Sequence, residues 1–412
     1  MQINVSNILE RIIWILTVVL LFSFTAFETS QYISLILLGI TICIFILDFL
    51  FNDMKSIIKF SLFHSWVISF AIFCFLSSLW AIDSDFAIIK GFTIIQILIC
   101  MSVLYNHFSR NFDAKFLLSC IEYAGYALAI YAICIYGAGV IKQVLASGAR
   151  LSTDFANINS IGMACANAIL IGVYYVISEN HKILFKLPFM LISLIIVAAS
   201  GSRKALMILI LGITCLYLYK YAGRNILKTI LKFTLVLCIL GGVFSIILSM
   251  QIFDTINDRM VGLVALITGE GVVDESTYLR QQFIKIGLEQ FLETPFVGIG
   301  IDNARLLLLQ HFGYTTYLHN NYVELLASGG IVGASLFYSI YAYIIYKLKS
   351  NWKNYSSEKI AVLLLILLML TMDFGAVSYY SKSTYFYIMM FFLFIKYNTR
   401  RRRNQDEDKK IS

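Results

Sequence analysis

Long apolar segments alternate with short polar ones along most of the chain. Apolar runs of roughly 18–25 residues recur throughout the sequence, and a helix of that length spans the hydrocarbon core of a bilayer. The runs are continuous rather than alternating, which is typical of transmembrane helices and not of a β-barrel. We therefore expect an all-α polytopic membrane protein with twelve spans, at about residues 9–27, 31–51, 61–80, 86–105, 116–138, 158–178, 184–200, 203–220, 226–250, 321–346, 360–376 and 382–398.

A polar interval between the ninth and tenth predicted spans, from about Gln251 to Glu324, breaks this pattern. Up to residue 320 it contains eight acidic and four basic residues, a net charge of −4 in a chain whose net charge is +8. A broad apolar stripe predicts a helix over Ser276–Glu293 that lies on the membrane surface or against the bundle. Pro295 ends this helix, and the apolar run Leu306–Leu309 predicts a second, short one.

The distribution of Lys and Arg gives the predicted orientation, because these residues accumulate on the cytoplasmic side. With a cytoplasmic N-terminus, most of the 32 basic residues fall on the inner side and the long polar interval faces outward. The expected organisation is nine spans in residues 1–250, an outward loop in 251–320, three spans in 321–398 and a basic cytoplasmic tail in 399–412. We interpret the tail as contacting anionic lipid and predict no nucleic-acid partner.

Composition and motifs exclude several kinds of site. The chain is 59% hydrophobic and 14% charged, and its eight cysteines lie in or beside apolar runs without a CxxC pair. This argues against a disulfide framework or a cysteine zinc site. The sequence has no HExxH, Walker or GxSxG motif. Of its two DxD spacings, Asp83–Asp85 is in a short outer turn with no third ligand nearby, and Asp406–Asp408 lies in the charged tail. We predict no metal and no cofactor.

Two cations at the start of the eighth span depart from the positive-inside trend. The segment reads SGSRKA, with Arg203 and Lys204 in the first helical turn, where the helix dipole disfavours positive charge. Ser200 or Ser202 would cap this helix. Free N–H groups beside Arg203 would bind a phosphate or diphosphate. The alternative is that both cations extend to lipid headgroups.

A second cation of interest is Arg280, near the start of the predicted loop helix. It would also suit an anion site, and the alternative is a surface salt bridge to the preceding acids, which contributes little. Arg259 and Arg305 are competing candidates in the same loop.

A polar run at the start of the tenth span is the third unusual feature. It comprises His319, Asn320, Asn321, Tyr322 and Glu324, and ionisable groups at a membrane boundary indicate function. A histidine titrates near neutrality and can act as a base. The alternative is an interfacial helix cap with Tyr322 in the aromatic belt.

Together these segments resemble the O-antigen ligase and polymerase superfamily. The resemblance rests on SGSRKA, an arginine before a loop helix, the PFVGIGIDN turn and HNNYVELLASGGIVG, of which the last is the most specific. The twelve-span layout with a loop after the ninth span is also similar. The sequence-specific part covers about residues 200–205 and 275–335.

The resemblance implies a metal-independent, inverting glycosyltransferase of the bacterial inner membrane, with its site facing the periplasm. The donor would be a glycan on undecaprenyl diphosphate, and the acceptor a lipid-linked repeat or lipid A–core. By motif position, Arg203 and Arg280 would hold the diphosphate and His319 would activate the acceptor hydroxyl. Substrate contacts are expected from the neighbouring residues Ser202, Lys204, Asn320, Asn321, Tyr322 and Glu324.

The resemblance leaves polymerase and ligase open. A ligase transfers the finished chain to lipid A–core, whereas a polymerase transfers the growing chain to the next lipid-linked repeat. Lys204 and the HNNYVELL segment look more like a polymerase. An alternative of another class is a transporter of lipid-linked glycan, which would place charged or broken helices near the membrane midplane.

Overall fold

The computed structural model describes residues 5–28, 33–51, 60–110, 112–147, 149–152, 156–179, 183–221, 275–350, 352 and 358–411. Every regular element in these ranges is an α-helix. The helices are α1 (Val5–Ala26), α2 (Ile33–Phe51), α3 (Leu62–Ser77), α4 (Ser84–Phe108), α5 (Ala114–Ser147), α6 (Ile158–Glu179), α7 (Ile183–Ala199), α8 (Arg203–Tyr221), α11 (Glu275–Glu293), α12 (Ala304–Phe312), α13 (Asn321–Ser350), α14 (Lys359–Met372) and α15 (Lys382–Ile411).

The predicted apolar spans coincide with helices throughout the described residues. Five of these helical segments are long and apolar enough to cross a membrane, and four shorter apolar helices accompany them. The all-α membrane architecture is therefore confirmed, while the total of twelve spans stays a prediction. The predicted ninth span at 226–250, and the loop up to residue 274 with its candidate Arg259, lie outside the described residues.

The two predicted loop helices are also present. The helix expected at Ser276–Glu293 is α11, which begins one residue earlier, and the run Leu306–Leu309 lies within α12. Two helices are kinked at a glycine with non-helical backbone angles, Gly137 in α5 and Gly330 in α13. The helical segment after Gly137 extends α5 to Ser147, beyond the predicted end of that span at about residue 138.

The chain divides into two compact units. The first contains Met1–Ile36 and Lys115–Thr277, and the second contains Leu37–Ala114 and Tyr278–Ser412. In the first unit, α6 packs against both α7 and α8. A buried ion pair joins α5 to α7, where Lys186 Nζ lies 2.8 Å from Glu122 Oε1. Pairing of this kind is expected for charges inside a membrane protein.

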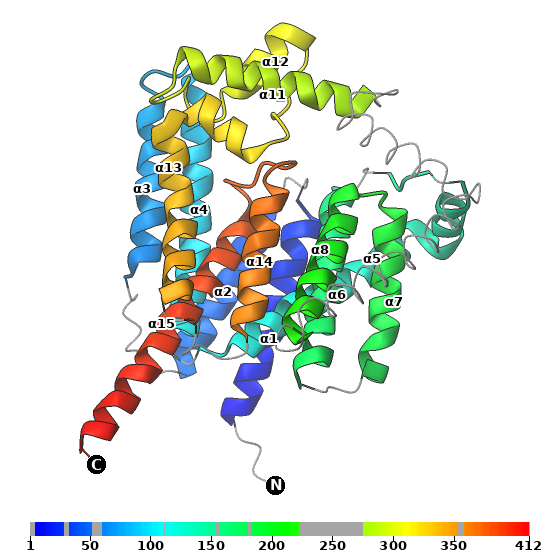
Figure 1. Cartoon of the computed structure of the whole chain (residues 1–412), viewed down its shortest axis with the longest axis vertical. Helices are drawn as coiled ribbons and strands as arrows, with labels where there is room; N and C mark the ends of the chain where they lie inside the picture. Colours follow the sequence, from blue (N-terminus) through cyan, green and yellow to red (C-terminus); the bar gives the residue numbers. More distant parts are fainter. Residues whose placement is uncertain are drawn as a thin grey trace. The chain divides into compact units, whose positions relative to one another are not determined.

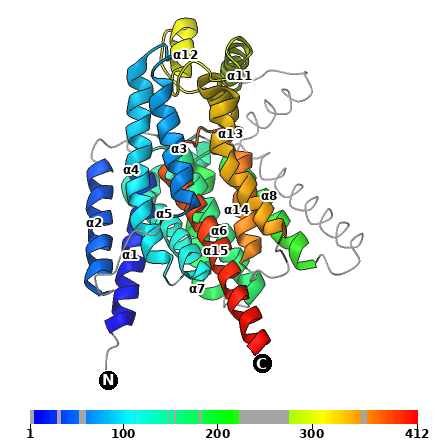
Figure 2. The same ribbon diagram turned by 90° about the vertical axis from the view of Figure 1, so that its left-hand side faces the viewer.

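In the second unit, α3, α4 and α13 lie side by side, and α11 and α12 lie across their ends (Figure 1). The view turned by 90° shows the same arrangement (Figure 2). Apolar side chains of α11, α12 and the start of α13 form one buried cluster, made of Phe283, Ile286, Ile299, Ala304, Leu307, Leu308, Leu318, Val323 and Ala327. Phe283 and Ile286 of the predicted stripe therefore pack against protein, whereas Leu288 and Leu292 are exposed.

The turn after α11 is joined to α13 by backbone hydrogen bonds. The carbonyls of Pro295 and Phe296 accept from Ile331 and Val332, with N–O distances of 2.8 and 3.1 Å. These two N–H groups turn away from the helical pattern at the kink, where Gly330 has φ 61°. A Cβ atom on Gly330 would lie 2.3 Å from the Phe296 carbonyl. Two of the motif segments, PFVGIGIDN and SGGIVG, are thus in direct contact.

Candidate functional site

The start of α8 has the cap that the sequence predicts. Ser202 Oγ accepts from the N–H of Ala205 at 3.4 Å, and Ser200 Oγ accepts from the N–H of Ser202 at 3.2 Å. Arg203 is partly exposed, and its Nη2 donates to Thr277 Oγ1 at 3.1 Å. Lys204 is also partly exposed. The first helical turn therefore combines a satisfied serine cap with a guanidinium fixed by a hydroxyl from the start of α11.

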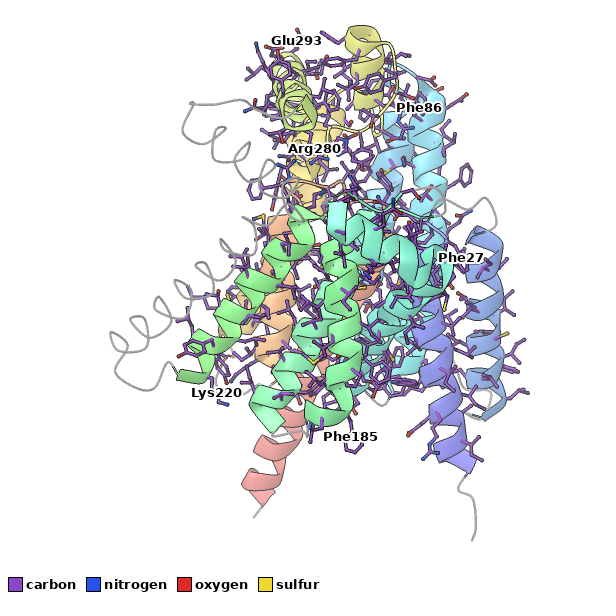
Figure 3. The ribbon with its side chains drawn as sticks, turned by 90° about the vertical axis from the view of Figure 1, so that its right-hand side faces the viewer. Phe27, Phe86, Phe185, Lys220, Arg280 and Glu293 are labelled. Carbon is purple, nitrogen blue, oxygen red and sulfur yellow. The ribbon has the colours of Figure 1, made fainter. Side chains whose placement is uncertain are left out.

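Arg280 lies in the second turn of α11 and is partly exposed (Figure 3). Residues three apart share one face of a helix, so Thr277, Arg280 and Phe283 follow the same stripe of α11. The competing candidate Arg305 is engaged elsewhere, because its Nη2 lies 2.7 Å from Asp302 Oδ1.

His319 adopts a left-handed backbone with φ 58°, a conformation that is uncommon for residues other than glycine and often marks function. Its ring centroid lies 4.2 Å from that of Tyr317 and 6.1 Å from that of Phe283, with the Phe283 ring nearly parallel. The preceding residue, Leu318, is fully buried in the apolar cluster. The imidazole is therefore held between two aromatic rings, one of them from α11.

Glu324 lies one turn into α13 and is 1% exposed. Its Oε2 accepts from the backbone N–H of Leu318 at 2.8 Å. A buried carboxyl with this partner fixes the backbone next to His319.

Asn320 forms the cap of α13. Its Oδ1 accepts from the N–H groups of Tyr322 and Val323 at 3.0 and 3.1 Å, as an N-cap residue does. Tyr322 donates its hydroxyl to the Leu370 carbonyl at 2.8 Å and stacks on Tyr338 with centroids 4.9 Å apart. The cap interpretation of this run is therefore correct for Asn320, and Tyr322 packs against α14.

Asn321 joins the start of α13 to the segment between α14 and α15. Its backbone N–H donates to the Asp373 carbonyl and its Nδ2 donates to the Tyr338 hydroxyl, both at 2.8 Å. Its Oδ1 accepts from the N–H groups of Ser378 and Tyr379 at 2.8 and 3.1 Å. The buried amide uses both of its ends, so it holds two chain segments together.

A charged cluster in the same unit combines the competing candidate Arg305 with Lys90 and Asp302, which were not among the predicted site residues. Lys90 of α4 lies 3.5 Å from Asp302, which also pairs with Arg305. Burial raises the pKa of the Asp302 carboxyl, while the charges of Lys90 and Arg305 act in the opposite direction. One feature of the sequence marks Lys90 as unusual: it is a cation in the second turn of an otherwise apolar span.

The described part of the chain has no group of three His, Cys, Asp or Glu residues that could hold a metal ion. Of the first DxD spacing, Asp83 caps α4, since its Oδ1 accepts from the N–H of Asp85 at 2.9 Å. The side chains near His319 are the aromatic rings of Tyr317 and Phe283, and its neighbours Leu318 and Asn320 are held by hydrogen bonds at the start of α13.

Comparison with known families finds a match in the part of the chain that carries the candidate residues. Residues 188–338 match the O-antigen ligase family, and a comparison of the whole chain with curated proteins found no match. The matched range includes α8 from its first residue, α11, α12 and the kinked first half of α13. It thus contains all three motif positions, Arg203, Arg280 and His319. The resemblance to the O-antigen ligase and polymerase superfamily is therefore confirmed, through an O-antigen ligase domain at residues 188–338.

Proposed function

We propose that this protein is a glycosyltransferase of surface-polysaccharide assembly that acts at the periplasmic face of the bacterial inner membrane. Its donor is a glycan on undecaprenyl diphosphate, and its acceptor is a sugar of a lipid-linked repeat or of lipid A–core. The match of residues 188–338 to the O-antigen ligase family supports this class of reaction. The apolar helices support a reaction on lipid-linked substrates, because the lipid tail stays within the bilayer.

The proposed chemistry is a single displacement that inverts the sugar's anomeric centre. The acceptor oxygen forms the new glycosidic bond while the bond to the diphosphate breaks and its electron pair leaves with the phosphate. Arg203 and Arg280 stabilise the negative charge that develops on the leaving group, since guanidiniums bind phosphate oxygens bidentately. His319 takes the proton of the acceptor hydroxyl. This account needs no metal.

The observation that carries the proposal is the stack of Phe283 on His319. Phe283 lies one turn after Arg280 on the same face of α11. This contact supports the proposal that the base and a diphosphate ligand lie at the same helix of the loop. Arg203, which donates to Thr277 one turn before Arg280, is the proposed second ligand.

The other predicted contacts divide into two groups. Lys204 is partly exposed, and we propose that it adds a further positive charge for the diphosphate. The remaining five are engaged with protein partners, and we propose that they shape the site around the substrate: Ser202, Asn320, Asn321, Tyr322 and Glu324.

Gel electrophoresis of lipopolysaccharide from a gene-deletion strain distinguishes the two forms of the reaction. We favour the polymerase, for which the deletion leaves lipid A–core capped by one repeat. Core without any repeat would indicate the ligase. An unchanged ladder of chain lengths would contradict both.

A transporter of lipid-linked glycan is the alternative of another class. Purified protein in liposomes, given a lipid-linked glycan donor and acceptor, should form a new glycosidic bond detectable by mass spectrometry. Movement of the lipid-linked substrate between leaflets without a new bond would favour the transporter.

A further inference from the structure

Three charged side chains from separate segments of the second unit form a compact group. Lys90 comes from the second turn of α4, Asp302 from the turn that follows α11, and Arg305 from the first turn of α12. Lys90 Nζ lies 3.5 Å from Asp302 Oδ2, and Arg305 Nη2 lies 2.7 Å from Asp302 Oδ1. We call these three residues the Lys90 cluster.

Aromatic rings cover the Lys90 cluster. Lys90 Nζ lies 3.5 Å from the centre of the Tyr380 ring, and Arg305 Cζ lies 5.0 Å from that of Phe86, which Figure 3 labels near the start of α4. The side chains of Lys90, Asp302 and Arg305 are 13%, 5% and 28% exposed. The three side chains are thus largely shielded from water, and Arg305 is the most exposed of them.

The cluster has more hydrogen-bond donors than acceptors. Within the described residues, Asp302 is the only acid in ion-pair contact with either cation. Its separation from Lys90, 3.5 Å, is longer than that of a good charged hydrogen bond. Arg305 Nε is buried without a hydrogen-bond partner. Because buried donors are normally satisfied, the cluster suits a ligand that supplies oxygen atoms.

The turn that carries Asp302 is held rigidly in an unusual conformation. Asp302 has φ 65°, in the left-handed region that residues other than glycine seldom adopt. On one side, the N–H of Ile301 donates to Ser77 Oγ at 3.1 Å. On the other, Asn303 Nδ2 donates to the Asp83 carbonyl at 3.1 Å. A carboxylate fixed in a strained backbone by its neighbours is typical of a functional position.

The charges in and beside the cluster argue against a diphosphate ligand. The carboxyl of Glu324 also lies within electrostatic range of Lys90 and Arg305. Asp302, which is in ion-pair contact with both cations, offsets one of their two positive charges, so little positive surplus remains for a multiply charged anion. A neutral sugar fits better, because its hydroxyls both donate and accept hydrogen bonds and its C–H faces pack on aromatic rings.

The cluster also adjoins the proposed base. Burial raises the pKa of the Tyr380 phenol, and the charges of Glu324, Asp302 and Tyr317 act in the same direction. Tyr380 contacts Lys90. Ala304, the neighbour of Arg305, and Leu318, the neighbour of His319, belong to one buried apolar cluster. A sugar bound at the Lys90 cluster would therefore lie on the same part of the second unit as His319.

We propose that Lys90, Asp302 and Arg305 form the subsite that binds the acceptor sugar. The proposal rests on the proposed function. Lys90 Nζ and Arg305 Nε donate to ring or hydroxyl oxygens. Asp302 Oδ1 already accepts from Arg305 and from the Tyr379 hydroxyl, so Asp302 Oδ2 is the atom that accepts from a sugar hydroxyl. His319 then faces the hydroxyl that is to be glycosylated.

A binding experiment on the full-length protein in nanodiscs tests this assignment without requiring turnover. The probe is the oligosaccharide released by mild acid from lipopolysaccharide of the gene-deletion strain, which ends in the unextended acceptor for ligase and polymerase alike. Ligand-observed NMR gives its affinity for wild type, Lys90→Met and Arg305→Lys. Arg305→Lys keeps the charge and the pairing with Asp302 but removes Nε. The matched control is Lys285→Met, at an exposed position of α11.

Both cluster variants should bind the oligosaccharide about tenfold or more weakly, the loss expected for a hydrogen bond to a charged group. Lys285→Met should bind it as wild type does. Wild-type affinity in both cluster variants, or no binding by wild type, would overturn the assignment. If Lys90→Met does not fold, as judged by thermal melting, Arg305→Lys decides the question.

Failure of the subsite and failure of the proposed function give different results. If the function is wrong, Arg203→Ala and Arg280→Ala cells keep a normal ladder whatever the oligosaccharide affinities are. If only the subsite is wrong, those cells lose the ladder while Lys90→Met and Arg305→Lys bind the oligosaccharide normally.

Discussion

The carboxylate of Glu324 accepts a hydrogen bond from the backbone N–H of Leu318, with an oxygen–nitrogen distance of 2.8 Å. Both residues are buried, and Leu318 immediately precedes His319 with its left-handed backbone. The strained conformation of the proposed base is thus held from inside the protein. We propose that Glu324 acts through the position of His319 rather than by its charge.

Substitutions of Glu324 should separate the hydrogen bond from the charge. Glu324→Gln keeps an acceptor oxygen for Leu318 N–H, so we expect most of the glycan chain formation to remain. Glu324→Leu leaves a buried N–H unpaired, which costs about 1–3 kcal/mol, and should abolish chain formation. Lipopolysaccharide gels at matched protein levels measure both. Equal loss in the two variants would show that the charge itself is required.

The contact between the PFVGIGIDN turn and the kink of α13 should contribute to the stability of the fold. Gly330→Ala forces a side chain into a left-handed backbone, and its Cβ would lie 2.3 Å from the Phe296 carbonyl. We expect a loss of about 1–3 kcal/mol, seen as a lower melting temperature in detergent. The control is Gly39→Ala, at a helical position with no atom within 4 Å of the added Cβ. Equal melting temperatures for the two variants would contradict the contact.

The sequence predicts the helices well because their apolar length is a local property. Ser202 as the cap of α8 and the end of α11 before Pro295 follow from local rules as well. The kink at Gly330 could not be predicted in this way. It depends on carbonyls of Pro295 and Phe296, some 35 residues earlier in the chain, that replace the helical partners of two N–H groups.

Asn321 should be important for stability even without any substrate contact. Asn321→Ala removes the side-chain partners of Ser378 and Tyr379 and a donor to Tyr338. Since the amide is fully buried, each unpaired group costs about 1–3 kcal/mol. We expect a large drop in melting temperature. Melting like wild type would contradict the assignment of Asn321 as the residue that joins these segments.

Removal of divalent metal should leave the reaction intact, because Arg203 and Arg280 neutralise the leaving diphosphate in our proposal. Purified protein given lipid-linked donor and acceptor should form product equally with and without excess EDTA. A loss of product in EDTA that added Mg²⁺ restores would contradict the proposed metal-independent reaction.

Residue type and spacing indicated part of the candidate site but not its internal contacts. In the sequence, His319 stands out at the start of an apolar span and Arg280 stands out in a loop helix. The structure adds the contact of His319 with Phe283, which lies one turn after Arg280 on α11. Lys90 gave a weak signal, because a single cation in a span is also common as an interfacial anchor. Its pairing with Asp302, more than 200 positions away in the chain, becomes visible only in three dimensions.

Complementation of the deletion strain tests the central claim most directly. Cells that produce Arg203→Ala, Arg280→Ala or His319→Ala at the wild-type protein level are compared with cells that carry Lys285→Met, and lipopolysaccharide is resolved on gels. The account predicts that the first three lose all long glycan chains while the Lys285→Met cells keep the normal ladder. A wild-type ladder in the Arg203→Ala and Arg280→Ala cells would contradict it.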